Sequence, residues 1–112
     1  YARKEHPNWT EEDIIPWAKS KQQFKKSVLT MIPSLAINWP TIEEKIKCPA
    51  LIMTADQKKG AIISPKTLSE VMHNHPNWES TYYEDSGHNI HRDQFELSQQ
   101  AIAAFLKKVY RK

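Results

Sequence analysis

The chain has 112 residues, of which 39% are hydrophobic, enough for one small domain with a single core. Its formal net charge is +3, but the basic residues occur in scattered pairs, which is typical of a solvated surface and argues against a nucleic-acid partner. No apolar run approaches the ~18 residues that cross a bilayer, no signal-peptide pattern opens the chain, and the single cysteine excludes an internal disulfide framework. These features predict a cytoplasmic protein without membrane contact.

The first part of the chain predicts helices. Thr10 is followed by three acids and is placed to cap a helix whose apolar residues, at helical spacing, extend to Phe24. A second helix is predicted over 27–34. Trp39-Pro40 is expected to break the pattern, and residues 41–46 predict a further short turn of helix.

The pattern changes after Cys48, whose position just before an apolar run predicts a packed thiol. The continuous apolar run at 50–54 is typical of a strand buried on both faces, as in a parallel sheet. Ser64 followed by a proline predicts the start of a helix that ends near His75. A second strand is predicted over 79–84. A last helix is predicted over 92–110, with a core stripe of Ile102, Phe105, Leu106 and Val109.

The order strand, helix, strand, helix predicts an α/β fold in which two parallel strands are joined by a right-handed crossover, with flanking helices. The loops after the two strands then share the C-terminal edge of the sheet, where ligands and catalytic groups collect in open α/β sheets. Asp56 lies in the first loop and His88 in the second. We therefore expect these residues to emerge from adjacent strands, ~4.8 Å apart.

His88 is the main candidate for proton transfer. An imidazole titrates near neutral pH, so it can take a proton from a nucleophile and return it to a leaving group. A carboxylate on its other ring nitrogen would fix the tautomer and stabilise the imidazolium, and Asp56 is the best-placed acid for this role. The alternative interpretation is that His88 and Asp56 are ordinary loop residues with structural roles.

The loop that precedes His88 offers other acids. Glu84 and Asp85 are alternative partners for the histidine, whereas Asp93 is expected to cap the last helix. Gly87 is expected to permit the sharp turn before His88, because glycine tolerates a positive φ.

Several segments resemble parts of the α/β-hydrolase family. Residues 48–56 (Cys-Pro-Ala-Leu-Ile-Met-Thr-Ala-Asp) and 60–65 (Gly-Ala-Ile-Ile-Ser-Pro) resemble its acid-bearing strand and loop. Residues 82–95, which contain Ser-Gly-His-Asn, resemble its closing histidine motif. Residues 6–39 are similar to the cap inserted before the acid strand.

This resemblance implies a helical cap or lid segment at 1–46 and the C-terminal part of an α/β-hydrolase core at 47–112. It implies that His88 is the catalytic base and that Asp56 orients it. The implied activity is hydrolysis of a small ester, lactone or related substrate, with no metal or organic cofactor.

The family's nucleophile lies in a Gly-x-Ser-x-Gly motif on a strained turn between a strand and a helix. The chain has two glycines, Gly60 and Gly87, and neither belongs to such a motif. Cys48 precedes its strand, at the edge opposite His88, and cannot serve. We therefore expect a C-terminal fragment that is inactive alone and that associates with a missing N-terminal part, or with itself, through an open sheet edge.

Trp17, Phe24 and Trp39 are candidates for lining an apolar substrate pocket under the cap, with a buried cap core as the alternative. His73 and His75 have no cysteine or acid cluster beside them, so no metal site is predicted. The rival functional hypothesis is a non-catalytic α/β-hydrolase-like domain that binds a ligand or a partner, because this fold also hosts functions without chemistry.

Overall fold

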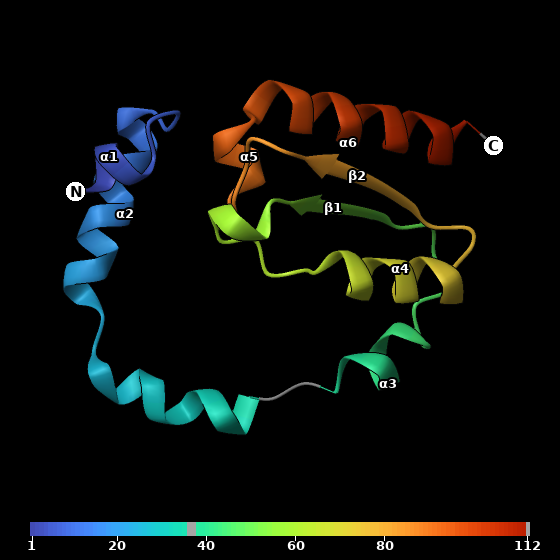
Figure 1. Cartoon of the computed structure of the whole chain (residues 1–112), viewed down its shortest axis with the longest axis horizontal. Helices are drawn as coiled ribbons and strands as arrows, with labels where there is room; N and C mark the ends of the chain where they lie inside the picture. Colours follow the sequence, from blue (N-terminus) through green and yellow to red (C-terminus); the bar gives the residue numbers. More distant parts are fainter. Residues whose placement is uncertain (36–37, 112) are drawn as a thin grey trace. The chain divides into compact units, whose positions relative to one another are not determined.

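The structure, a computed structural model, describes residues 1–35 and 38–111 (Figure 1). The chain divides into two compact units, Tyr1–Cys48 and Pro49–Lys112. This division lies two residues after the predicted boundary between residues 46 and 47. The first unit is helical in its described part, and the second is mixed α/β with a two-stranded parallel sheet and flanking helices. The assignment of the first unit to a cap stays a prediction.

The first unit begins with α1 (Ala2–Glu5), which was not predicted, and α2 (Glu11–Gln23). Helix α2 confirms the helix predicted after Thr10, which is its N-cap residue. The Thr10 hydroxyl, however, donates to the Asp13 carboxylate at 3.2 Å and makes no capping hydrogen bond, so the predicted side-chain cap is wrong. The acids of the first turn stabilise the positive end of the helix instead.

An ion pair joins α1 to α2. The Arg3 guanidinium donates two hydrogen bonds of 2.7 Å to the two carboxylate oxygens of Glu11. The hydrogen bond from Arg3 lowers the pKa of the Glu11 carboxyl. Both side chains are largely exposed, so the pair orients α1 more than it stabilises the unit.

An aromatic cluster forms the core of these two helices. Trp9 is buried, with 6% of its surface exposed, and stacks on His6 with 3.9 Å between ring centroids. Trp17 meets both rings edge-on, with its centroid 5.3 Å from that of His6 and 5.9 Å from that of Trp9. The Lys21 ammonium lies 5.1 Å from the Trp17 ring centroid, within the range of a cation–π contact.

Two shorter helices complete the described part of this unit. The 3-10 helix η1 (Lys26–Leu35) confirms the predicted second helix, although with tighter hydrogen bonding, and α3 (Trp39–Glu43) follows it. The predicted break at Trp39-Pro40 is wrong, because these residues begin α3. A proline in the first turn of a helix loses no intrahelical hydrogen bond.

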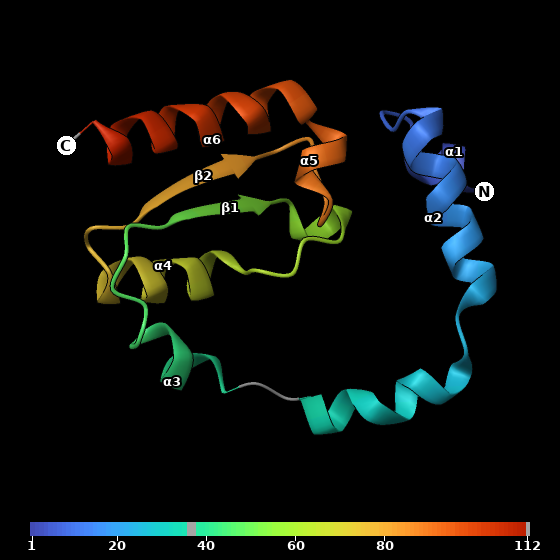
Figure 2. The same cartoon turned by 180° about the vertical axis from the view of Figure 1, so that it is seen from behind.

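The second unit is built on two parallel strands. Strand β1 (Leu51–Ala55) pairs with β2 (Glu79–Tyr83), in a register from Leu51 opposite Glu79 to Ala55 opposite Tyr83. Helix α4 (Pro65–Asn74) connects the strands, and α6 (Phe95–Tyr110) lies on the opposite side of the pair from α4 (Figure 1 and Figure 2). The predicted parallel strand–helix–strand unit is therefore confirmed.

Helix α4 begins and ends where the sequence predicts. The Ser64 side chain accepts a hydrogen bond from the Thr67 amide at 3.0 Å and so caps the first turn. The helix ends before His75, whose ring stacks on Trp78 with 3.9 Å between centroids. This stack lies at the point where the chain turns into β2.

The last helix is interrupted. The predicted helix at 92–110 is instead α5 (Ile90–Asp93) followed by α6, separated at Gln94, whose φ of −137° and ψ of 58° are not helical. The predicted core stripe is wrong for Leu106, which is 43% exposed, and its other members are only half-buried. The residue of α6 that is fully buried is Ser98. None of the helices in the described ranges is long and apolar enough to cross a membrane.

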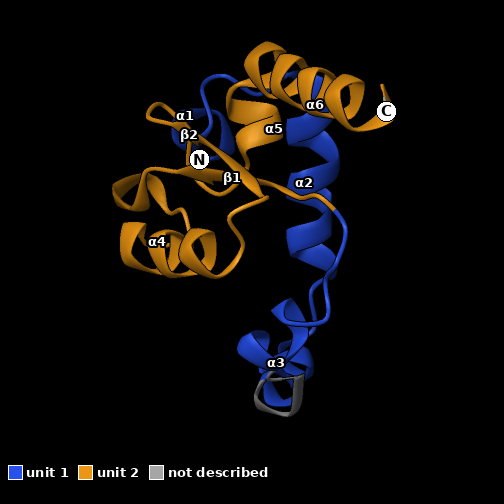
Figure 3. Cartoon of the chain, turned by 90° about the vertical axis from the view of Figure 1, so that its right-hand side faces the viewer, with its two compact units in different colours: residues 1–48 blue, residues 49–112 orange. Residues whose placement is uncertain are grey.

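Strand β1 is only partly covered, although four of its five residues are apolar. Thr54 and Ala55 are 5% and 4% exposed, but residues 51–53 are half-buried. The prediction that the whole run is buried on both faces is therefore wrong, because the two-stranded sheet supplies β1 with a single neighbour. The apolar core of this unit, orange in Figure 3, consists of Ala55, Val71, Trp78 and Tyr83.

The backbone hydrogen bonds identify which groups of β1 point away from β2. The Glu79 amide donates to the Ala50 carbonyl. In a strand, the backbone N–H and C=O groups of alternate residues point to the same neighbouring strand. The backbone groups of Ile52 therefore point toward β2, and those of Met53 point away from it. Within residues 1–35 and 38–111 no third strand pairs with this outward edge. Such an edge is a template for another strand.

We expect the purified chain to associate through the outward edge of β1. Met53→Pro removes an outward amide and should lower the sedimenting mass toward the 13.1 kDa of one chain while the helix content is kept. Ile52→Pro removes an amide that faces β2 and should unfold the second unit instead. Sedimentation equilibrium together with circular dichroism measures both effects. A well-folded monomeric parent chain would contradict the prediction.

Candidate functional site

Two loops follow the C-terminal ends of β1 and β2 at one edge of the sheet (Figure 1). Asp56 opens the first loop, and His88 lies near the end of the second. The Asp56 amide donates to the Ser86 carbonyl at 3.1 Å, and this backbone hydrogen bond joins the two loops just beyond the paired strands. The predicted proximity of the two loops is confirmed. The catalytic roles predicted for Asp56 and His88 stay predictions.

Asp56 is half-buried and firmly held. Its carboxylate Oδ1 accepts a hydrogen bond from the Lys58 amide at 2.9 Å and so caps the 3-10 turn η2 (Gln57–Lys59). Its carbonyl accepts hydrogen bonds from the Lys59 and Ala61 amides at 3.0 and 3.2 Å. These bonds fix the backbone of the predicted acid, and the second carboxylate oxygen takes no part in the cap.

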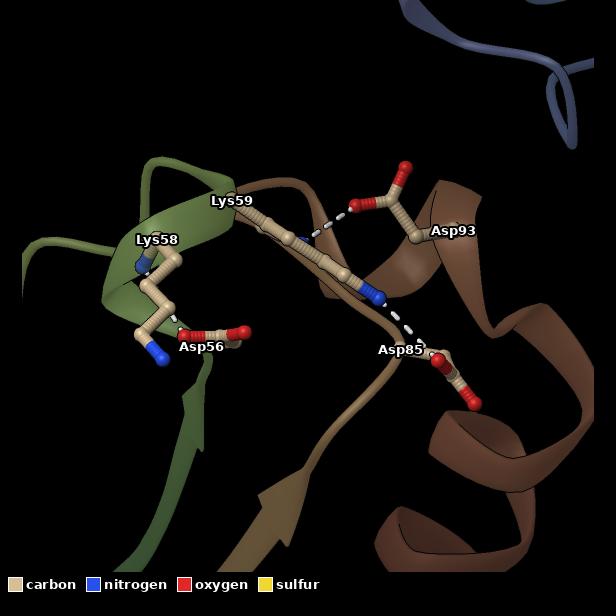
Figure 4. Close-up of polar contacts among 6 residues, drawn as sticks. Asp56, Lys58, Lys59, Asp85 and Asp93 are labelled. Carbon is tan, nitrogen blue, oxygen red and sulfur yellow. Dashed lines mark hydrogen bonds and ion pairs between the residues drawn. The ribbon is translucent and has the colours of Figure 1, made fainter.

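An ion pair crosses from the first loop to the second. The Lys59 ammonium donates to Asp85 Oδ1 at 3.0 Å, and Figure 4 shows this side chain extended between the loops. The hydrogen bond to Asp85 is the main cause that raises the pKa of Lys59; burial opposes it, and the charges of Asp85, Asp56 and Glu84 reinforce it. Asp85, an alternative acid for the histidine, is therefore occupied by Lys59. The pair is too exposed to contribute much stability.

Gly87 is buried at the point where the two loops touch. A Cβ atom at this position would collide with the carbonyl oxygen of Lys59. The prediction that Gly87 supplies a positive φ is wrong, because the glycine with a positive φ is Gly60, at 92°, which ends η2. Gly87 is needed for space, since a residue without a side chain lets two backbones approach closely.

The amide of Gly87 is held by a residue of α5. It donates to Asp93 Oδ2 at 2.9 Å, a bond that Figure 4 shows behind the Lys59 side chain. Asp93 is the last residue of α5, so the bond ties this short helix to the turn before His88. The prediction that Asp93 caps the last helix is wrong: the N-cap of α6 is Gln94, which makes no capping hydrogen bond.

His88 is exposed and immediately precedes Asn89, the N-cap of α5. In the described parts of the chain no hydrogen bond joins His88 to Asp56. The structure therefore brings the two loops together without pairing the two side chains. His91, three residues later, is also exposed.

Ser86 is the hydroxyl nearest to His88 along the chain. It is 0% exposed, and its Oγ has no hydrogen-bond partner within the described residues. A buried hydroxyl without a partner costs roughly 1–3 kcal/mol, so this position carries a local penalty. Because it is fully covered, Ser86 is not accessible to a substrate.

The three aromatic residues predicted to line a pocket have different surroundings. Trp17 belongs to the cluster with His6 and Trp9, which agrees with the alternative of a buried core. Phe24 follows α2 and is 51% exposed, and Trp39 begins α3 and is 45% exposed. A hollow of about 450 Å³ between α1 and α2 is lined by none of the three. A substrate pocket formed by them stays a prediction.

Cys48 is exposed, so the predicted packed thiol is wrong. It precedes β1, whereas Asp56 follows that strand, so the thiol and the candidate site belong to opposite ends of the strand. Among the residues that the structure describes, no cluster of three or more metal-binding side chains occurs.

The sequence did not predict the contacts that two residues of the site, Lys59 and Asp93, make in the structure. Lys59 was assigned to ordinary surface, and Asp93 to a helix cap. The contact of Lys59 could have been inferred from charge. Lys58-Lys59 lies in one loop and Glu84-Asp85 in the other, and parallel strands bring these loops together. No local pattern indicates the bond from Asp93 to the Gly87 amide, because it depends on the short helix α5.

Comparison of the chain with protein-family models, with curated proteins and with solved structures finds no match.

The two glycines provide a test of this loop contact. Gly87→Ala forces a Cβ into the Lys59 backbone and should destabilise the second unit by more than about 2 kcal/mol. Gly60→Ala meets open space and strains only its own backbone, which costs roughly 1–2 kcal/mol. Urea unfolding followed by circular dichroism measures both losses. Equal losses, or a larger loss for Gly60→Ala, would show that the loops do not touch at Gly87.

Proposed function

We propose that this chain supplies the histidine and the acid of a nucleophile–histidine–acid triad in an α/β-hydrolase-type enzyme. The proposed substrates are small esters, lactones or related compounds. The observation that carries the proposal is that Asp56 and His88 follow adjacent parallel strands at one sheet edge, with their loops joined by the Asp56–Ser86 backbone bond. Catalytic groups of open α/β sheets collect at this edge.

In the proposed reaction His88 acts as general base and then as general acid. Its exposed imidazole is accessible to a reacting group. Asp56 would accept a hydrogen bond from the other ring nitrogen and stabilise the imidazolium, using the carboxylate oxygen that does not cap η2. Catalytic hydrogen bonds are often long or poorly aligned before substrate binds. The lack of a hydrogen bond between Asp56 and His88 in the described part of the chain is therefore compatible with this role.

The nucleophile is proposed to come from outside these 112 residues. Neither glycine lies in a nucleophile-elbow motif. Ser86 is fully buried, and Cys48 precedes the strand whose far end carries Asp56. The remaining serines have no strand-to-helix turn with small flanking residues around them. The 112-residue chain alone would therefore not turn over an ester.

A second candidate function is a non-catalytic binding domain with the same fold. The observation in its favour is that Asp56 caps η2 and forms no hydrogen bond with His88 in the described residues. In that case both side chains would be ordinary loop residues, and the domain would bind a ligand or a partner without chemistry.

The test is ester hydrolysis by a polypeptide that carries this chain together with a nucleophile-bearing N-terminal segment. With p-nitrophenyl butyrate, His88→Ala should lower kcat/KM by about 10⁴-fold, because the general base is lost. Asp56→Asn keeps an acceptor for the Lys58 amide but removes the charge, and it should lower kcat by roughly 10³- to 10⁴-fold.

Two matched variants serve as controls. His91→Ala removes another exposed imidazole three residues away and should leave kcat/KM within about twofold of the parent. Asp85→Asn removes a carboxylate that pairs with Lys59 and should have a far smaller effect than Asp56→Asn. Normal turnover in His88→Ala would refute the triad. A folded polypeptide that binds a ligand but hydrolyses no ester would favour the binding domain.

A further inference from the structure

The turn that carries His88 has two contacts at Gly87. The Lys59 carbonyl oxygen occupies the space where a side chain would lie. The Gly87 amide donates a hydrogen bond to Asp93 Oδ2, with 2.9 Å between the nitrogen and the oxygen. A displacement of the turn away from α5 would therefore break this hydrogen bond.

We infer that Asp93 is a positioning residue, which holds the Gly87 backbone and through it holds His88 at the sheet edge. The inference rests on the proposed function, because the position of His88 affects a reaction only if His88 is the general base. In this role Asp93 acts through the backbone of Gly87, the residue before the histidine.

The chemistry of the bond suits this role. A hydrogen bond from an amide to a carboxylate is charge-assisted, shorter and stronger than a bond between neutral groups. Gly87 is buried and the bond is part-buried, so loss of the acceptor would leave an amide poorly satisfied. Because α5 has only four residues, its own hydrogen bonds hold the turn weakly. The carboxylate of Asp93 therefore adds a restraint that the helix backbone does not supply.

A positioning role differs from a merely structural one in what it changes. A displaced general base slows the chemical step, and an error of about 1 Å can cost about 10²-fold in rate. Gly87 is buried and offers a substrate no exposed surface, so KM should be almost unchanged. A structural role would lower the stability of the unit and leave kcat of the folded fraction unchanged.

The experiment compares variants of the active polypeptide described above. Asp93→Ala should lower kcat for p-nitrophenyl butyrate by about 10²-fold, with KM within about threefold of the parent. Asp93→Asn keeps an acceptor oxygen and should recover most of this loss. Amide hydrogen exchange at Gly87, followed by NMR, should become at least about tenfold faster in Asp93→Ala.

The control is His75→Ala, which removes the ring stack on Trp78 at the opposite end of β2. It should lower the melting temperature while leaving kcat and the Gly87 exchange rate at the parent values. An Asp93→Ala variant whose kcat falls no further than that of His75→Ala would overturn the inference. So would a rise in KM with unchanged kcat.

Failure of the proposed function would be visible separately. If His88→Ala turns over the ester as fast as the parent, both the triad and the positioning role are refuted. Faster Gly87 exchange in Asp93→Ala would then still report the hydrogen bond itself. If His88→Ala is inactive but Asp93→Ala is fully active, the triad stands and the positioning role alone is overturned.

Discussion

The parallel pairing of β1 with β2 is the interaction on which the candidate site depends. The strands pair from Leu51 opposite Glu79 to Ala55 opposite Tyr83, and beyond them the Asp56 amide donates to the Ser86 carbonyl of the other loop. Because the strands are parallel, both carboxyl ends fall at the same edge, and two loops far apart in the sequence become neighbours. In an antiparallel pair Asp56 and the histidine loop would emerge at opposite ends. Every contact between the loops follows from this one pairing.

Three different contacts join the loops, and each requires a different kind of residue. The backbone hydrogen bond from Asp56 to Ser86 requires no particular side chain. The close approach at Gly87 requires that a side chain be absent. The Lys59–Asp85 pair requires opposite charges, but it is exposed and contributes little stability. As a result, an exposed His88 follows a restrained backbone, and this agrees with the proton-transfer role that we propose for it.

The second unit is less well buried and less fully paired away from the carboxyl ends of the strands. The best-buried strand residues, Thr54, Ala55 and Tyr83, lie at the ends of the strands that carry the loops. The beginning of β1 is half-buried although it is apolar, and its outward backbone groups have no strand beside them in the described residues. Continuous apolar strands normally lie inside larger sheets, and unpaired edges attract further strands. These properties support the proposal that the unit works together with another polypeptide segment.

Local sequence determined the two strands and the helix between them, and their order, but not the division of the last helix into α5 and α6. The apolar run of β1 and the Ser64 cap depend on residues only a few positions apart, and parallel pairing follows from the strand–helix–strand order. Only the tertiary structure decided the details of the site. It showed that Gly87 is required for space and that Asp93 holds an amide of the loop and does not cap a helix. Local patterns do not indicate these two roles, because each depends on a group that lies close only in the folded chain. For Gly87 this group is the Lys59 carbonyl, and for Asp93 it is the Gly87 amide.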